Sequence, residues 1–310
     1  MKNILLATTA LVLSAGLAHA QAVTITGEGR MGLMYTSGGA GWSTENRLTL
    51  NFNVAVQADH GLSFGAWTRA RMSGRGGTAV VTPGPDGLPG TADDEVGRVN
   101  GFSGSRVWVE ASGLRLTFGN VDGAFRGTGV AFGYLGGCGV GYEGGQQCGD
   151  AMGLLPITQG QNSTGVISAQ RVRVDYTMGS TRVSISNDNG TATDATEIGV
   201  RTTFDAWTVA AGYSTGPFGV DFYSVSAAYN GGSWSAGAAV AADGVVTNYV
   251  LQASANLGGG RLYGYVGEVN TLRSYGLNYG YGLGGGATLS IGAERVGAVT
   301  TASVGVAFNF

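Results

Sequence analysis

The feature that most constrains this chain is a strict alternation of apolar and polar residues, which recurs along most of its length. One such segment runs from Val23 to Tyr35. Its odd-numbered positions are mostly apolar, as at Leu33, whereas its even-numbered positions include Glu28 and Arg30. A period of two places successive side chains on opposite faces of a β-strand. Each segment of this kind is therefore predicted to be a strand with one apolar and one polar face.

Sixteen segments show this alternation, and no stretch shows sustained helical periodicity. In two of them, 218–229 and 261–268, apolar residues fall on both parities, which also allows a β-bulge. The predicted strands are 23–35, 47–57, 62–71, 106–111, 114–118, 170–178, 182–186, 196–204, 207–213, 218–229, 234–240, 249–257, 261–268, 275–281, 287–294 and 302–310.

The connections between these strands alternate in length, which favours a membrane barrel. Tight turns such as Ser112-Gly113 alternate with longer segments such as 73–97 and 120–165. Outer-membrane barrels have this habit, with the tight turns at the periplasmic end. Only 12% of the residues are charged and the mean hydropathy is +0.12, so a soluble all-β protein is the other reading.

Residues 1–20 are predicted to be a cleaved signal peptide, which leaves residues 21–310 as a single barrel domain. Lys2 supplies a positive charge, residues 4–17 are mostly apolar, and 18–20 (Ala-His-Ala) form a small-x-small cleavage site. The apolar run is too short to span a bilayer as a helix. In the remaining chain sixteen arginines stand against twenty acidic residues. This acid excess argues against nucleic acid as a partner, because phosphate binding requires a basic surface.

The final predicted strand carries the most specific signal. Residues 304–310 read Val-Gly-Val-Ala-Phe-Asn-Phe and end on Phe310. In a soluble protein such an apolar strand edge would promote aggregation. The ending resembles the closing strand of outer-membrane barrels. With the signal peptide, the strand count and the long third loop, the whole chain resembles the general bacterial porin family, in the style of the Rhodobacter-type porins of alphaproteobacteria.

This resemblance implies an all-β fold, a sixteen-stranded antiparallel transmembrane β-barrel in the Gram-negative outer membrane. It also implies a third extracellular loop (about 120–165) that folds inward and narrows a water-filled pore. Small hydrophilic solutes and ions would diffuse passively through a homotrimer, surrounded by outer-membrane lipid and lipopolysaccharide and without a required cofactor. The alternatives are a channel selective for one substrate class and a non-conducting structural or adhesive barrel. An enzyme is disfavoured, since His60 is the one histidine of 21–310 and falls in a predicted turn.

Arginines in the predicted strands share the polar face with Thr, Ser and Asn, which places them in the lumen. An arginine facing lipid at mid-bilayer would cost roughly 2–4 kcal/mol. Porins, as the resemblance implies, set such a wall against carboxylates of the third loop, and the opposed charges create a field across the narrowest point. The other reading is that the arginines pair with Glu28, Glu110 or Asp175 and stiffen the wall. The predicted basic wall comprises Arg30, Arg47, Arg69, Arg71, Arg106, Arg115, Arg171 and Arg173, with Arg182 and Arg201 on the same face.

The third loop holds the predicted partners of this wall, Asp122, Glu143 and Asp150. The family's Pro-Glu-Phe-Gly-type signature is not recognisable in this loop, so position alone assigns them. Cys138 and Cys148 enclose nine residues in the same loop. In an oxidising compartment such a pair predicts a disulfide. It would stabilise the loop by roughly 2–3 kcal/mol in the chain-entropy account.

A second long loop, around 83–95, is rich in Gly and Pro and carries four acidic residues: Asp86, Asp93, Asp94 and Glu95. Oxygen-rich loops of this kind can hold Ca²⁺. The spacing does not match an EF-hand, and a solvated acidic loop is the other reading. By the resemblance, this loop reaches over to a neighbouring subunit.

Two further expectations concern ion preference and surface shape. The arginine wall favours anions, whereas the acid excess of the chain and its acidic loops favour cations, and we predict a slight cation preference. Gly27, Gly29 and the many later strand glycines predict a smooth wall against which subunits pack. Trp67 and Trp108 fall on the polar face, where they would pack against the third loop.

Overall fold

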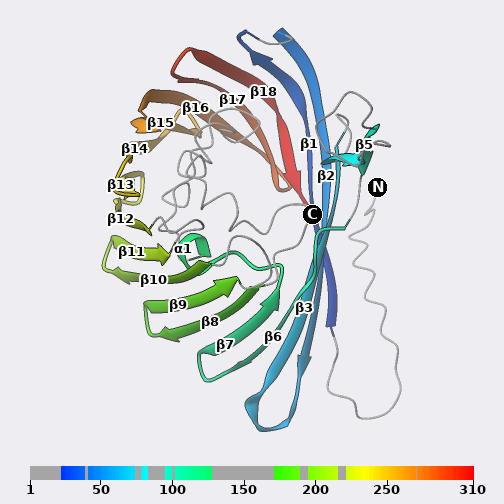
Figure 1. The fold of residues 1–310 in the computed structure, drawn as a ribbon. Helices are drawn as coiled ribbons and strands as arrows, with labels where there is room; N and C mark the ends of the chain where they lie inside the picture. The colour runs from blue at the N-terminus through cyan, green and yellow to red at the C-terminus, as the bar shows by residue number, and fades with distance from the viewer. Residues whose placement is uncertain are drawn as a thin grey trace.

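The computed structural model describes most of the predicted barrel domain. Sixteen strands form one closed antiparallel barrel, in which each strand pairs with its neighbours and β1 pairs with β18 (Figure 1). The predicted fold class and all sixteen predicted strands are therefore confirmed. Residues 1–21, which include the predicted signal peptide, lie outside the described part. The described residues are 22–38, 41–73, 78–82, 95–99, 102–127, 171–188, 195–215, 221–269 and 271–310.

The barrel strands run along the chain in the order in which they pair around the wall, interrupted once by a small separate sheet. β4 (Thr78–Thr82) and β5 (Glu95–Val99) pair only with each other, inside a segment predicted to be an open loop. The barrel strands are β1 (Ala22–Thr36), β2 (Gly41–Gln57), β3 (Ser63–Ser73), β6 (Arg106–Ala111), β7 (Leu114–Gly119), β8 (Arg171–Met178), β9 (Thr181–Asp188), β10 (Ala195–Phe204), β11 (Trp207–Thr215), β12 (Asp221–Asn230), β13 (Trp234–Ala242), β14 (Thr247–Leu257), β15 (Gly260–Val269), β16 (Leu272–Gly284), β17 (Ala287–Val296) and β18 (Val299–Asn309).

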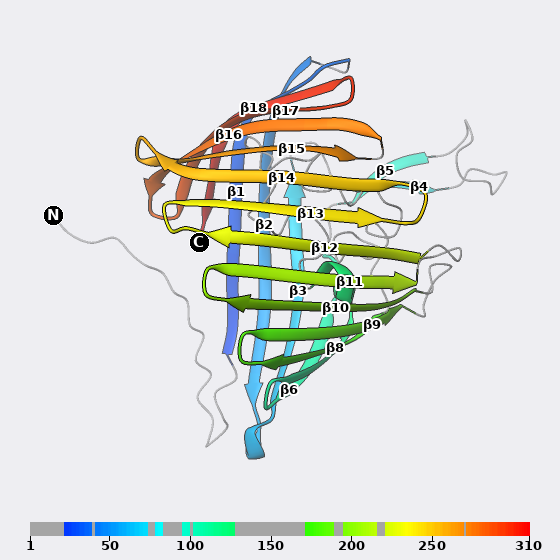
Figure 2. The same ribbon diagram turned by 90° about the vertical axis from the view of Figure 1, so that its left-hand side faces the viewer.

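The two ends of the barrel differ as expected from the connection lengths. The turns β8–β9, β10–β11 and β12–β13 lie at one end, and the β4–β5 sheet lies at the other (Figure 2). Two tight turns place non-glycine residues in the left-handed region, Ser112 at φ 48° and Asp205 at φ 50°. Short polar side chains tolerate this conformation because they can hydrogen-bond locally.

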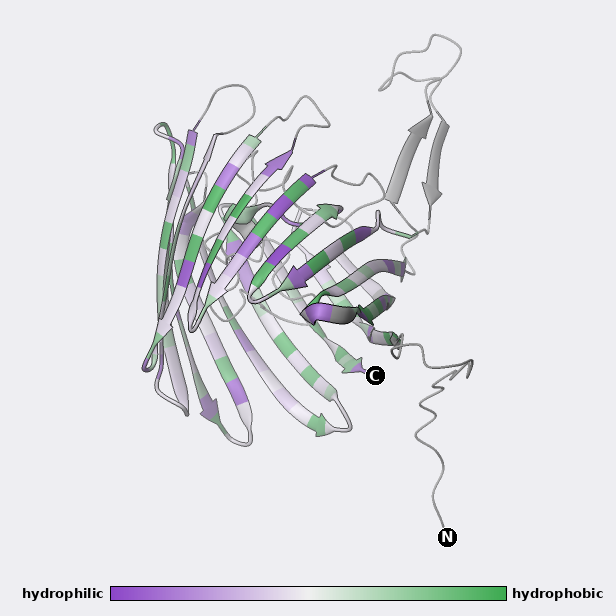
Figure 3. Cartoon of the chain, turned by 90° about the horizontal axis from the view of Figure 1, so that it is seen from below, coloured by the Kyte–Doolittle hydropathy of each residue, from purple (hydrophilic) through white to green (hydrophobic). Residues whose placement is uncertain are grey.

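The wall is apolar outside and polar inside, the reverse of a water-soluble protein. Large apolar side chains such as Ile25 and Ile291 are more than half exposed on the outer face, whereas inward side chains such as Ser184 and Asn248 are buried. Apolar and polar residues alternate visibly along the strands (Figure 3). An exposed apolar outer surface around a polar interior is the arrangement that lipid outside and water inside require. Among the described helices, none is long and apolar enough to cross a bilayer.

The register of the wall is regular except at one position. In the described parts of the two segments in which apolar residues fall on both parities there is no bulge, since β12 and β15 keep an unbroken register with both neighbours. In the described pairs the register shifts instead between Gly282 and Gly284, next to the β16–β17 turn. The alternation of buried and exposed residues in β12 shows that Tyr223 and Val225 face outward and Phe222 inward.

The closing seam overturns one expectation about the outer surface. Gly27 and Gly29 of β1 are not bare, because the rings of Phe310 and Phe308 lie directly over them. The outer surface at this seam is therefore aromatic, and the prediction of a smooth glycine surface is wrong at Gly27 and Gly29. A ring packed over a strand glycine recovers apolar contact that the glycine itself cannot make.

Candidate pore wall and loop anchor

All ten arginines of the predicted wall lie on one continuous face of the barrel. The strand pairing places Arg30 directly opposite Arg47 and Arg201 opposite Arg182. Arg106 lies opposite Trp67, whose side chain is on the same face. This is the face that carries the buried serines and threonines, so it is the lumen face. They come from β1–β3 and β6–β10, which form one side of the barrel (Figure 1).

Several of these arginines pair with Glu28, Glu110 or Asp175, as the second interpretation of the arginine wall predicts. Glu28 Oε1 accepts a hydrogen bond from Arg30 Nε at 2.5 Å, and the same oxygen lies 3.6 Å from Arg47 Nη2. The other pairs join Arg115 to Glu110 at 2.6 Å, Arg173 to Asp175 at 2.9 Å and Arg182 to Asp175 at 2.7 Å. Part of the wall is thus internally neutralised.

Arg69, Arg71 and Arg106 differ, because no carboxylate of the described residues lies within ion-pair distance of them. The guanidinium of Arg106 lies 4.0 Å from the ring centroid of Trp67, and that of Arg69 lies 5.6 Å from the same centroid. A cation over an indole face is attracted by the ring quadrupole. Trp67, on the polar face, therefore holds two arginine side chains in place.

A recess on this wall brings three arginines together. It has a volume of about 630 Å³ and is lined by Arg30, Arg69 and Arg71 with Thr26, Glu28, Thr49, Asn51 and Asn309. The Nε–H of Arg71 and the hydroxyl of Thr49 are buried and have no hydrogen-bond partner among the described residues. Buried donors of this kind normally have a partner.

The start of the third loop turns into the lumen. After β7, residues 120–127 run along the inner wall and form the short helix α1 (Ala124–Gly127), which lies against β9, β10 and β11 (Figure 1). The backbone N–H of Ala124 donates to Ser186 Oγ at 2.8 Å. The backbone N–H of Phe125 donates to Glu197 Oε2, also at 2.8 Å. Two N–H groups at the start of α1, which a short helix leaves unpaired, thus find acceptors on the wall.

Two arginines of β8 hold the carbonyl groups of the same segment. Arg171 donates to the Val121 carbonyl and pairs through Nη2 with Asp188 at 2.9 Å. Arg173 donates to the Asp122 carbonyl at 2.8 Å. The side chains of Arg171 and Asp188 are only 0% and 2% exposed, so this pair is fully removed from water. Together with Glu197 and Ser186, these groups form what we call the loop anchor.

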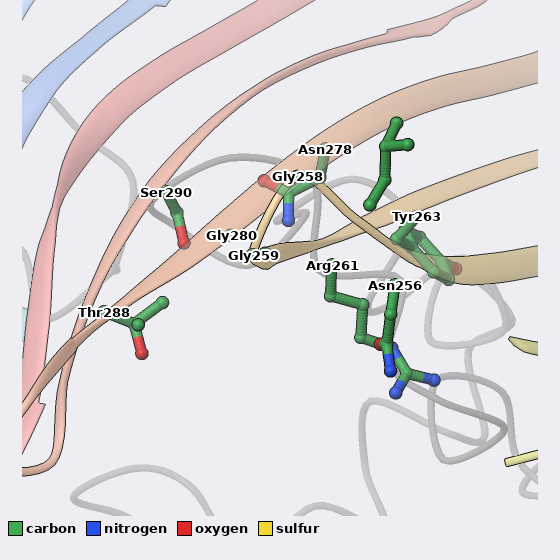
Figure 4. A pocket seen from close by; sticks show the side chains of 12 residues that line it. Asn256, Gly258, Gly259, Arg261, Tyr263, Asn278, Gly280, Thr288 and Ser290 are labelled. Carbon is green, nitrogen blue, oxygen red and sulfur yellow. The ribbon is translucent and has the colours of Figure 1, made fainter. Parts of the chain in front are cut away.

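The opposite wall is nearly uncharged. It contains a recess of about 790 Å³ between β14 and β17, in which Arg261, Tyr263 and Asn278 are prominent (Figure 4). Arg261 Nη2 donates to Ser254 Oγ at 2.6 Å and to Ser235 Oγ at 3.1 Å. Hydroxyl groups therefore position this arginine, in contrast to the carboxylates and the indole of the basic wall.

Several predicted site residues lie outside the described part of the chain: Glu143, Asp150, Cys138, Cys148, Asp86, Asp93 and Asp94. Glu95 begins β5. Asp122 is described and lies close enough to Arg69 and Arg106 to interact with both electrostatically. In the described residues, no three His, Cys, Asp or Glu side chains lie close enough together to hold a metal ion.

Sequence reasoning missed the acceptors of the loop anchor. The one sequence signal that could have found them is alternation, which places these residues on the same lumen face as the arginines: Ser186, Asp188 and Glu197. Their role depends on the path of residues 120–127, which alternation does not encode.

A family model described as Gram-negative porin matches residues 7–300. Among solved structures, a five-substitution mutant of Rh. blastica porin matches with a TM-score of 0.71 and 21% sequence identity, over 93% of this chain and 100% of that chain. A triple mutant of Rhodopseudomonas blastica porin matches with a TM-score of 0.69 and 22% identity, over the same shares of the two chains. No curated protein sequence matches the chain.

Proposed function

Given that this chain belongs to the Gram-negative porin family, we propose that its basic wall and the inward segment 120–127 decide which solutes pass. Family and fold make the protein a multi-pass outer-membrane protein with a water-filled channel for passive diffusion of small hydrophilic solutes and ions. A sixteen-stranded barrel is too wide for its own side chains to fill, so the lumen holds water. The proposal concerns how that water-filled path is narrowed and charged.

The observation that carries the proposal is the separation of charge inside the lumen. Arg69, Arg71 and Arg106 stand on one wall with no carboxylate of the described residues within ion-pair distance, and Asp122 of the inward segment interacts electrostatically with Arg69 and Arg106. Unpaired charges fixed on a low-dielectric wall produce a field in the water beside them. Glu143 and Asp150 would add to the acidic side of this field.

The test is the reversal potential of single channels in a planar bilayer under a salt gradient. The described wall favours anions, whereas the acid excess of the whole chain favours the slight cation preference predicted from sequence. Replacing Arg69 and Arg106 by glutamine should shift the reversal potential toward cation preference. An unchanged reversal potential in this variant would refute a role of the wall in selectivity. A folded barrel with no conductance would instead favour a structural or adhesive role.

Further parts of the proposal extend beyond the barrel wall. We propose a homotrimer in contact with outer-membrane lipid and lipopolysaccharide, and no catalytic step or required cofactor. Cys138 and Cys148 would form a disulfide within the third loop. Asp86, Asp93, Asp94 and Glu95, in the sequence from the end of β4 to the start of β5, would form the candidate Ca²⁺ loop. Conductance steps in groups of three would support the trimer.

A further inference from the structure

The recess beside Arg71 has more positive charge than its neighbours neutralise. Arg71 interacts electrostatically with Arg30, Arg47 and Arg69, and Glu28 is the one carboxylate among the described residues that lines the recess. Both oxygens of Glu28 already accept hydrogen bonds from Arg30, and Arg47 approaches one of them. With Glu28 in the recess and Asp122 near Arg69, four guanidinium groups face two carboxylates of the described residues, which leaves an excess of positive charge at this place.

The recess also contains donors that the protein does not use. The Nε–H of Arg71 and the hydroxyl of Thr49 line the recess and are buried without a hydrogen-bond partner among the described residues. The same holds for the Nε–H of Arg47, which lies opposite Arg30 in the strand pairing but does not line the recess. Leaving a buried donor unpaired costs free energy, which a ligand that accepts a hydrogen bond from it recovers. The amide of Asn51 lines the same recess.

We propose that this recess binds a doubly charged oxyanion, with phosphate preferred over sulfate. Guanidinium groups bind the oxygen pairs of such anions in a fork, and neighbouring hydroxyl and amide groups add neutral donors. The recess faces the lumen, so the ligand is a free solute rather than a lipid head group. The inference rests on the proposed function, because the anion reaches the recess through an open channel.

Glu28 gives the preference for phosphate. Monohydrogen phosphate carries one hydroxyl that can donate to a carboxylate, whereas sulfate has only acceptors and is repelled by it. Glu28 lines the recess beside the arginines and can accept such a donor. A carboxylate in an otherwise basic site thus selects between two anions of equal charge.

The experiment measures chloride current through single channels while inorganic phosphate is added at mildly alkaline pH. A bound anion should reduce the current with a saturating dependence on phosphate concentration, and sulfate should require a higher concentration. The variant Arg71→Ala should raise the half-blocking phosphate concentration by roughly tenfold or more, the scale of one lost charge-assisted hydrogen bond. Arg71→Lys, which keeps the charge and loses the fork, should lie between.

Arg261→Ala is the matched control. Arg261 is also a lumen arginine, but hydroxyl groups hold it on the opposite wall. Its removal should leave the phosphate response unchanged. Heat-modifiable mobility on gels shows that each variant is folded.

Each part of the inference has its own contrary outcome. A current that falls in simple proportion to phosphate, or an equal loss of block in the Arg71→Ala and Arg261→Ala variants, would overturn the site. Equal block by sulfate and phosphate would overturn the role of Glu28. A folded wild-type barrel that conducts no chloride would refute the proposed function itself, which is a different result from a conducting pore that ignores phosphate.

Discussion

Phe310 and Gly27 exchange both of their backbone hydrogen bonds, at 2.8 and 3.1 Å, and the Phe310 ring fills the space that a side chain at position 27 would need. The same arrangement recurs one step along the seam, where Phe308 covers Gly29. The seam between β1 and β18 is thus sealed on its lipid face by aromatic rings packed over glycines.

Gly27→Ala should therefore weaken the barrel. The new methyl group would overlap the Phe310 ring, and overpacking of this kind costs roughly 1–3 kcal/mol. We expect a lower urea midpoint for unfolding in detergent. Gly282→Ala is the control, because no atom lies within 4 Å of a methyl group built at that strand glycine. Equal effects of the two substitutions would show that the ring contact is not the cause.

Removing the ring should relieve that overlap. Phe310→Ala alone should destabilise the seam through lost apolar contact. The double variant Gly27→Ala/Phe310→Ala should be more stable than the sum of the single effects predicts, by roughly 0.5–3 kcal/mol as for other contacting pairs. A double-mutant cycle on unfolding free energy measures this coupling, and strict additivity would contradict the packing of Phe310 on Gly27.

Arg171→Met should be strongly destabilising. It leaves the carboxylate of Asp188 buried without its cation, which costs roughly 3–5 kcal/mol. The matched control is Arg115→Met, since Arg115 and Glu110 are 44% and 41% exposed. An exposed pair of this kind contributes about 1 kcal/mol or less. Thermal unfolding monitored by gel mobility should separate the two variants clearly, and similar melting temperatures would argue against a buried anchor.

Glu197→Leu should release the start of the third loop. The substitution removes the acceptor of the Phe125 N–H, and an unpaired buried donor costs roughly 1–3 kcal/mol. We expect faster proteolysis within 120–127 and more current noise in single channels. Glu294→Leu is the control, because Glu294 is also a buried carboxylate but accepts from Tyr265 on the other wall. If both variants gave the same cleavage and noise, Glu197 would be a general stabilising residue and not an anchor.

The barrel was predictable from the sequence because its two environments act on every residue. Lipid outside and water inside impose a period of two on each strand, so even segments with mixed parity, such as 261–268, were placed correctly. The β4–β5 sheet was not predicted. Its strands read Thr-Ala-Val-Val-Thr and Glu-Val-Gly-Arg-Val, which do not alternate strictly, and Gly- and Pro-rich sequence lies between them.

The candidate site was less predictable, because its contacts join distant parts of the chain. Parity placed Arg171 in the lumen, but it did not show that Arg171 pairs with Asp188 beneath Val121. Likewise, Phe310 was expected at the end of the closing strand, whereas its contact with Gly27 depends on the register between β1 and β18. Alternation determines which face of the wall a side chain occupies, but it does not determine which residues of other strands lie next to that side chain.

The pairing of β1 with β18 joins the first and the last strand of the chain, so this seam can form only after all the strands have been synthesised. Near this seam, the backbone N–H of Thr300 donates to the hydroxyl of Ser37, which lies 263 positions earlier in the chain. Contacts between such distant residues form slowly, because a long loop must close before they stabilise the fold. β1 therefore has an unpaired edge until β18 has been synthesised and pairs with it. A chain that lacks β18 cannot form this seam, and its first strand keeps an unpaired edge of the kind that invites pairing with another chain.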